Sequence, residues 1–143
     1  MTGWVGLFLI CLLSPAGAAE PELRLSPKKI RDEVRAVVEA QLAALRTGDF
    51  ETAYDFAAAG IRRQFDARLF AAMIKRGYPA LLRPGQSDLG VVRDNGEGLA
   101  QILVTMTDRQ NRSTVYRYIL DKEEAGWRIN GVVLEQRPPR GDT

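Results

Sequence analysis

Residues 30–54, IRDEVRAVVEAQLAALRTGDFETAY, contain the strongest structural pattern in this chain. Its first apolar residues recur at spacings of three and four, which places them on one face of a helix: Ile30, Val34, Val37, Val38, Leu42 and Leu45. Gly48 interrupts this pattern, and Asp49 stands where it can cap a second helix that has Phe50, Ala53 and Tyr54 on its apolar face. The stretch therefore predicts a long amphipathic helix, a turn and a shorter helix.

Residues around this stretch predict where the helices begin and end. Ser26 and Pro27 form a start signal, in which Ser26 caps the long helix and Pro27 occupies its first position. Gly60 is expected to close the second helix in a left-handed conformation. A third helix is expected over 67–76, with a stop at Gly77-Tyr78-Pro79.

In the second half of the chain the apolar pattern changes to a period of two, which is typical of strands. Residues 99–107 and 113–120 alternate in this way, and Asn95-Gly96 predicts a hairpin turn before the first of these strands. A last strand is expected over 127–135, with a bulge at Gly131. The order of the elements predicts an α+β fold in which N-terminal helices pack on a curved antiparallel sheet, with a cavity between the layers.

The start of the chain predicts a signal peptide that is cleaved near Ala19. An apolar run from Trp4 to Leu13 is too short to cross a bilayer and leads into small residues that a signal peptidase accepts. No stable membrane span is expected after cleavage, and the mature protein is expected to be periplasmic or secreted. The predicted segments are a signal peptide over 1–19, a linker over 20–26, the α+β domain over 27–136 and a disordered tail over 137–143.

The composition limits the chemistry that this chain offers. It has 20 Lys and Arg against 18 Asp and Glu, and the basic residues are scattered, so nothing favours a nucleic-acid partner or an unselective membrane-surface role. The absence of histidine removes the commonest general base and metal ligand. Cys11 is the single cysteine and lies in the predicted signal peptide, so no disulfide is expected. The composition predicts no metal site and no cofactor.

Two sets of motifs resemble known families. One set resembles the opening of nuclear transport factor 2-like (cystatin-like) domains: Val38, Gln41, Leu45, Gly48-Asp49-Phe50-Glu51 and Ala53-Tyr54. The closing residues Gly126-Trp127-Arg128-Ile129-Asn130-Gly131-Val132 resemble the last strand of these domains. The second set resembles a bacterial exported family described as domain of unknown function 4864: Ile61-Arg62-Arg63-Gln64-Phe65, Gly77-Tyr78-Pro79 and Arg83-Pro84. The resemblance implies a cone of helices on a strongly curved sheet. Because the superfamily includes isomerases, dehydratases, ligand carriers and adapter domains, it leaves the function open.

Three kinds of side chain are candidates for a binding site. Aromatic residues at core spacings either line a pocket or fill the core: Tyr54, Tyr78, Tyr116, Tyr118 and Trp127. The amides of Gln101 and Asn130 stand among apolar strand residues, where they need partners or a ligand. Arg62 and Arg63, beside Gly60, either bind an anion at a helix start or form a solvated face. No catalytic residue is predicted.

These features favour a non-catalytic module that holds a small, largely apolar molecule between helices and sheet. A second interpretation is a dimerisation or protein-interaction module of the cell envelope, with the outer sheet face as its surface: Leu99, Gln101, Leu103, Val115 and Ile119. A third is a cofactor-independent enzyme of the isomerase or dehydratase kind, which needs a carboxylate opposite a donor such as Tyr54. Asp55 points about 100° away from Tyr54 on a helix, and no acid lies inside a predicted strand, so catalysis is the least favoured of the three.

Overall fold

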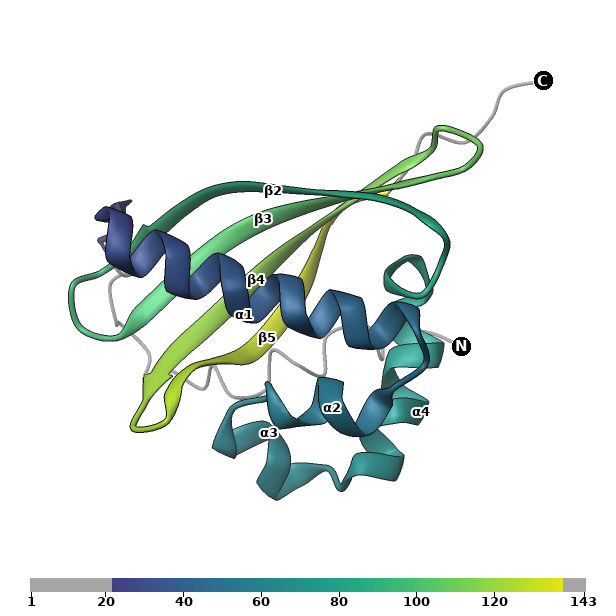
Figure 1. Cartoon of the computed structure of the whole chain (residues 1–143), viewed down its shortest axis with the longest axis horizontal. Coiled ribbons are helices and arrows are strands. Elements are labelled where there is room, and N and C mark those ends of the chain that lie inside the picture. Colours follow the sequence, from purple (N-terminus) through teal and green to yellow (C-terminus); the bar gives the residue numbers. More distant parts are fainter. Residues whose placement is uncertain (1–21, 138–143) are drawn as a thin grey trace, which may run out of the picture.

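The fold is a helical layer packed on a curved antiparallel sheet (Figure 1). The computed structural model describes residues 22–137, so the predicted signal peptide and residues 138–143 of the predicted tail lie outside the described residues. One sheet contains five strands in sequence order: β1 (Arg24–Leu25), β2 (Gly85–Asp94), β3 (Leu99–Asp108), β4 (Ser113–Glu123) and β5 (Gly126–Gln136). The helices are α1 (Lys28–Arg46), α2 (Phe50–Asp55), α3 (Ala59–Gln64), α4 (Ala67–Gly77) and the 3-10 helix η2 (Pro79–Leu81). The helices-then-meander order that the sequence predicts is confirmed.

The long helix α1 lies across one face of the sheet and supplies one wall of the core (Figure 1). Its predicted apolar stripe is buried, with exposures of 2% or less at Val34, Val38, Leu42 and Leu45. The chain turns at Gly48, where φ is +75°, and Asp49 caps α2 by accepting the backbone N–H of Thr52 at 3.1 Å. The predicted turn at Gly48 and the predicted cap of the second helix by Asp49 are therefore confirmed.

The start of the domain differs from the prediction. Ser26 does not cap α1, because the N-cap is Pro27, which forms no side-chain hydrogen bond. The Ser26 hydroxyl instead donates to Asp94 Oδ1 at 2.5 Å, and its N–H donates to the carbonyl of Val92 at 3.1 Å. These bonds form because β1, inside the segment 20–26 predicted as a linker, pairs with β2. The sheet thus recruits residues 24–26 into the domain.

Gly60 also has a role that differs from the prediction. It lies inside α3 and is not among the glycines with positive φ, whereas α2 already ends at Asp55. The residues after α2 pair with the sheet, since Ala58 N–H donates to the carbonyl of Ile129 and Ile129 N–H donates to the carbonyl of Phe56, both at 2.8 Å. This pairing ends α2 and brings α3 onto β5.

Bulges bend the sheet around the helical layer. The register of β4 and β5 shifts between Ile119 and Leu120, opposite Gly131 and Ile129, which leaves Asn130 as the additional residue. The predicted bulge at Gly131 is therefore confirmed. The same pair of strands has a second shift between Val115 and Tyr116, and a third, in β2 opposite β3, increases the local twist of the other half of the sheet.

The core lies between α1 and the inner face of the sheet, and α4 and η2 close it at one end (Figure 1). Tyr78, Tyr118 and Phe70 are the largest fully buried side chains. Over residues 22–137 no helix is long and apolar enough to cross a membrane.

Candidate functional site

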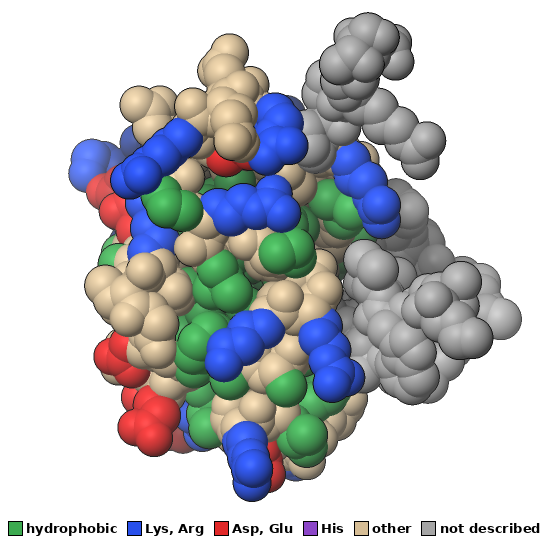
Figure 2. All heavy atoms as spheres, turned by 90° about the vertical axis from the view of Figure 1, so that its right-hand side faces the viewer, with side chains coloured by type: hydrophobic (Ala, Val, Ile, Leu, Met, Phe, Trp, Pro, Cys, Tyr) green, Lys and Arg blue, Asp and Glu red, His purple; other side chains and the backbone are tan. Residues whose placement is uncertain are grey.

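A groove of about 410 Å³ opens where α4 and η2 meet the ends of β4 and β5. It lies at the end of the molecule that Figure 2 turns toward the viewer. Its lining residues are Arg76, Gly77, Pro79, Ala80, Arg83, Thr114, Tyr116, Leu134 and Arg137. We call this the arginine groove, because three arginines and no carboxylate belong to its lining.

Buried residues between Arg76 and Arg83 hold these two arginines near each other, and we call them the anchor: Tyr78 and Leu81. α4 ends where Tyr78 N–H donates to the carbonyl of Ile74 at 2.9 Å, and the Tyr78 side chain then enters the core with 2% exposure. Leu81 in η2 is fully buried. Arg76 before this anchor and Arg83 after it are therefore held at the surface on the same side of η2, both exposed.

The inner wall of the groove comes from β4, where alternation turns Thr114 and Tyr116 inward. Tyr116 is 3% exposed, and its phenol oxygen accepts a hydrogen bond from the backbone of Ala80. Burial raises the pKa of Tyr116, while the positive charges of Arg83 and Arg137 act in the opposite direction. The phenol therefore stays protonated and uncharged at neutral pH.

The charge of the groove is not balanced by nearby acids. Among the described residues, none of its three arginines lies within ion-pair distance of a carboxylate. Asp108 lines an adjoining depression that shares Arg83 and Thr114 with the groove. Its carboxylate accepts the N–H groups of Gln110 and Arg112 and pairs with the Arg112 side chain at 3.0 Å, and these contacts lower its pKa, the backbone N–H of Arg112 most of all. Asp108 is thus neutralised within its own turn.

The aromatic residues predicted for a pocket separate into one groove residue and four others. All but Tyr54 are core residues with at most 4% exposure, and among these Tyr116 also belongs to the lining of the groove. Tyr54 is half-buried and ties the helices together, because its hydroxyl donates to the carbonyl of Phe65 at 2.6 Å.

The polar atoms of the buried aromatics differ in how they are satisfied. Tyr78 donates to the carbonyl of Val132 at 2.9 Å, and Trp127 Nε1 donates to Glu33 at 3.2 Å. The hydroxyl of Tyr118 is fully buried and has no hydrogen-bond partner among residues 22–137. Burial raises the pKa of both Tyr78 and Tyr118 far above its usual range, so both stay neutral. These side chains serve packing, and their predicted contact with a ligand stays a prediction.

The remaining candidates lie at two other places. Gln101 faces outward from β3, in a shallow depression of about 690 Å³ that also has Leu103 and Val115 in its lining. Asn130, at the bulge of β5, lines a depression of about 450 Å³ together with Arg63, Asp121 and Glu123. We call the second of these the acidic pocket.

Arg62 and Arg63 do not lie at a helix start, where the prediction placed them, and anion binding by these two arginines stays a prediction. Both residues belong to the last turn of α3, not to its start. At the start of α3 the N–H of Ala59 already donates to Glu123 Oε2 at 2.8 Å. Burial, and then the charge of Glu123, raise the pKa of Asp121 in the same pocket. Arg63 therefore shares its pocket with carboxylates, and the helix start is occupied by one of them.

The three arginines of the groove come from separate segments, and no pattern in the sequence predicts them as one site. The run Gly77-Tyr78-Pro79 and Arg83-Pro84 was the available signal, since both parts of it border the groove. Asp55, the acid weighed for catalysis, is exposed and lies outside the groove lining. Within residues 22–137 no group of three or more His, Cys, Asp or Glu side chains is arranged to hold a metal ion.

The helical layer on a curved five-stranded meander defines a protein of the nuclear transport factor 2-like, or cystatin-like, fold class. A domain of unknown function with a cystatin-like fold from Nostoc punctiforme PCC 73102 superposes with a TM-score of 0.58 at 15% identity, covering 80% of this chain and 82% of the other. An NTF-2-like protein of unknown function from Shewanella oneidensis MR-1 superposes with a TM-score of 0.54 at 13% identity, covering 73% of this chain and 98% of the other. Likeness at these identities establishes the fold alone.

The particular family follows from the sequence match. The chain belongs to the family described as domain of unknown function DUF4864, whose model matches residues 28–141. This confirms the narrower of the two resemblances. A comparison with curated proteins gave no match.

Proposed function

We propose that this domain is a non-catalytic binding module that holds a small anionic molecule in the arginine groove. The observation that carries the proposal is the convergence of Arg76, Arg83 and Arg137, from three segments, on a groove to which residues 22–137 contribute no carboxylate. Like charges held together repel one another, and an anionic ligand relieves that repulsion.

The lining of the groove favours a ligand with a charged head and a short apolar part. Guanidinium groups bind carboxylate or phosphate oxygens in a bidentate manner, and the hydroxyls of Thr114 and Tyr116 belong to the same lining. Leu134, Pro79 and Ala80 provide apolar surface beside them. The proposal keeps the predicted position between helices and sheet and replaces a largely apolar ligand by an anionic one.

A titration with hexyl phosphate tests this proposal. We expect the backbone NMR signals of Gly77, Ala80 and Tyr116 to shift on addition of hexyl phosphate, and to shift less with inorganic phosphate, which lacks the apolar part. Replacing both Arg83 and Arg137 by Gln removes two charge-assisted contacts and is expected to weaken binding about 100-fold. The matched control replaces Arg62 and Arg63, which are exposed and lie outside the groove lining, by Gln.

The controls decide between the groove and a general charge effect. Equal weakening in the two double variants would show that net charge alone attracts the probe. Shifts centred on Ala59 and Asn130 would place the anion in the acidic pocket and overturn the proposal. No shift at millimolar hexyl phosphate would also overturn it.

A second candidate function, protein–protein interaction, is favoured by the outer face of the sheet. Leu103 in β3 is 47% exposed and Val91 in β2 is 58% exposed, and both line the depression that contains Gln101. Exposed apolar side chains that adjoin one another are typical of interaction surfaces. Of the residues predicted for this surface, Leu103 is the most open, whereas Ile119 is 7% exposed.

Replacing Leu103 by Lys tests the second candidate. If this face pairs with another copy of the chain, sedimentation velocity should show a dimer for the unaltered protein and a monomer for Leu103→Lys. Leu69→Lys is the matched control, because Leu69 in α4 is 54% exposed and lies away from the sheet. A monomer at every concentration of the unaltered protein would argue against self-association.

We also propose that the domain works outside the cytoplasm. The apolar run from Trp4 to Leu13, followed by small residues, supports this. Mass spectrometry of the mature protein is expected to find an N-terminus at Glu20. A mature protein that retains Met1 would contradict export by cleavage.

A further inference from the structure

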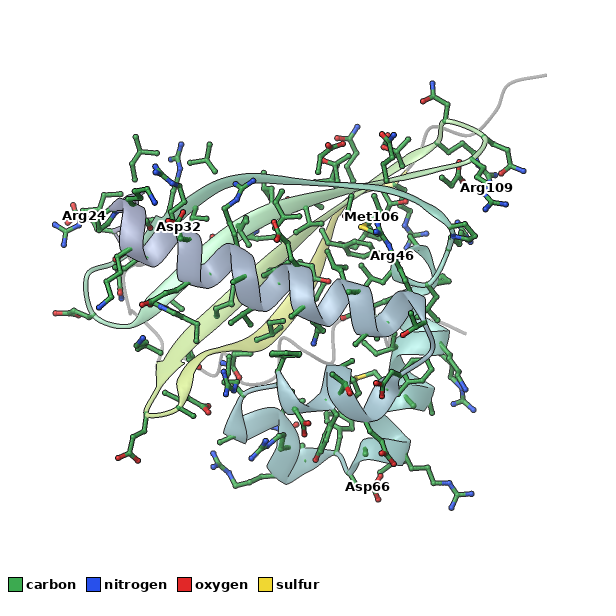
Figure 3. All side chains as sticks on the ribbon, viewed as in Figure 1. Arg24, Asp32, Arg46, Asp66, Met106 and Arg109 are labelled. Atoms are coloured by element: carbon green, nitrogen blue, oxygen red, sulfur yellow. The ribbon has the colours of Figure 1, made fainter. Side chains whose placement is uncertain are left out.

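The arginine groove is the centre of a wider basic surface at one end of the molecule. Figure 3 places Arg46, at the end of α1, and Arg109, in the turn between β3 and β4, at the same end as the groove. Neither residue lines the groove. Together with Arg76, Arg83 and Arg137 they form what we call the basic face, and all five are exposed.

Negative charge does little to offset the basic face. In Figure 2 basic side chains spread over this end of the molecule, with apolar side chains between them, and the acidic ones lie mainly along its edges. Asp108 is already held by Arg112. None of the five arginines forms an ion pair with another described residue.

We propose that the basic face docks this domain end-on against the surface of an anionic phospholipid bilayer. Such a surface presents many phosphates that move laterally, so it adapts to arginines spaced around a groove. Pro79 and Pro84 are exposed on either side of Arg83 and supply apolar contact with the interfacial region. Docking turns the mouth of the groove toward the lipid headgroups.

The described aromatic residues favour a lipid surface over single-stranded nucleic acid. Strand-binding proteins stack bases on accessible aromatic side chains. Over residues 22–137 every Phe, Tyr and Trp side chain is buried or half-buried, and Tyr116, the aromatic residue of the groove, is 3% exposed. The basic face therefore offers phosphate contacts without a stacking platform.

Vesicle co-sedimentation tests the proposal with the mature protein, which is expected to begin at Glu20, because the apolar run from Trp4 to Leu13 would itself bind any vesicle. We expect binding to vesicles of equal parts phosphatidylcholine and phosphatidylglycerol, no binding to pure phosphatidylcholine, and a steep loss of binding as salt is raised. Each basic residue near an anionic surface contributes about fivefold to the partition coefficient, so Arg46→Gln with Arg109→Gln should lower it about 25-fold. Neither change touches the groove lining, so hexyl phosphate binding should be unchanged.

The matched control carries the same charge change at the opposite end of the molecule. Lys29 and Arg31 are exposed in the first turns of α1, and replacing both by Gln should leave the partition coefficient unchanged. Equal loss in the two double variants would overturn the proposal, since net charge alone would then explain binding. Absence of binding to the anionic vesicles at low salt would overturn it too.

Two further outcomes separate this inference from its rivals. Tighter binding of a single-stranded oligonucleotide than of the anionic vesicles, lost in Arg46→Gln with Arg109→Gln, would assign the face to nucleic acid and overturn the lipid proposal. Vesicle binding that persists when hexyl phosphate binding fails would support the docking surface and overturn only the small-molecule function.

Discussion

The arginine groove and the acidic pocket are two polar depressions of similar size, about 410 and 450 Å³, where helices meet the sheet. Each has arginine in its lining, and each contains a polar residue that the sequence singled out, Tyr116 in one and Asn130 in the other. In the acidic pocket Arg63 lies with Asp121 and Glu123, and Glu123 occupies the start of α3. The groove has no such acid. Unbalanced charge, and not the presence of arginine, distinguishes a candidate anion site from a solvated polar surface.

The largest expected effect comes from giving the groove the charge pattern of the acidic pocket. Arg83→Glu places a carboxylate in the groove with Arg76 and Arg137, and like charge next to a bound anion costs about 3 kcal/mol, or about 100-fold in the hexyl phosphate dissociation constant. Calorimetric titration measures this constant. Arg63→Glu, the same exchange in the acidic pocket, should leave it unchanged. A loss of similar size in both variants would remove the distinction between the two depressions.

The next effect concerns the anchor behind the groove. Tyr78→Phe removes the buried hydrogen bond to the carbonyl of Val132 and should lower the free energy of unfolding by about 1.5 kcal/mol. Tyr118→Phe is the matched comparison, because it deletes a buried hydroxyl that has no partner, and it should be neutral or stabilising. Urea unfolding measures both. If Tyr118→Phe were as destabilising as Tyr78→Phe, the hydroxyl of Tyr118 would have a partner in solution.

A smaller effect is expected where the acidic pocket holds α3. Glu123→Gln weakens the acceptor of the Ala59 N–H and should cost about 1 kcal/mol of unfolding free energy. Its exposed neighbour Glu124 provides the control, since Glu124→Gln should change stability by less than about 0.5 kcal/mol. Hexyl phosphate binding should be the same in both variants. Tighter binding in Glu123→Gln would mean that the acidic pocket becomes an anion site once its charge is reduced.

The smallest effect is on the pH dependence of stability, to which Asp121 in the acidic pocket and Asp108 beside the groove contribute with opposite sign. Asp121 has a pKa raised above its ordinary 3.8 by burial and by Glu123, so its protonated form stabilises the fold below that value, and this contribution is lost as pH rises through the raised pKa. Asp121→Asn should therefore gain about 0.5 kcal/mol near neutral pH and nothing near pH 3, a small value because the half-buried group is screened.

Asp108, beside the groove, provides the contrast. Its lowered pKa means that its contribution to stability is present above the ordinary value of 3.8 and is lost as pH falls through the lowered one. Asp108→Asn should therefore be destabilising near neutral pH and should converge with the unaltered protein in acid. Thermal unfolding over a range of pH measures both variants, and parallel curves for the two would contradict this assignment of the charges.

Much of the fold was predictable because it depends on neighbours along the chain. The spacing of Val34, Val38 and Leu42 places them on one face of α1, and Gly131 marks the bulge that the register confirms. The prediction for Ser26 failed because its partners, Asp94 and Val92, belong to a strand far along the chain. A capping rule considers only neighbouring residues, so it takes no account of a partner that the folded sheet supplies.

The helices, the meander and the family can be read from the amino-acid sequence, since periodicity reports which residues are buried and the family match follows the order of residues. Which charges meet depends on how the chain folds. Arg76, Arg83 and Arg137 are scattered along the chain, and the folding of α4 and η2 against the ends of β4 and β5 brings them to one groove. It also set Arg63 in a pocket with acids. Electrostatic interaction depends on distance in space, and the alternation of apolar residues carries no information on that distance for surface charges.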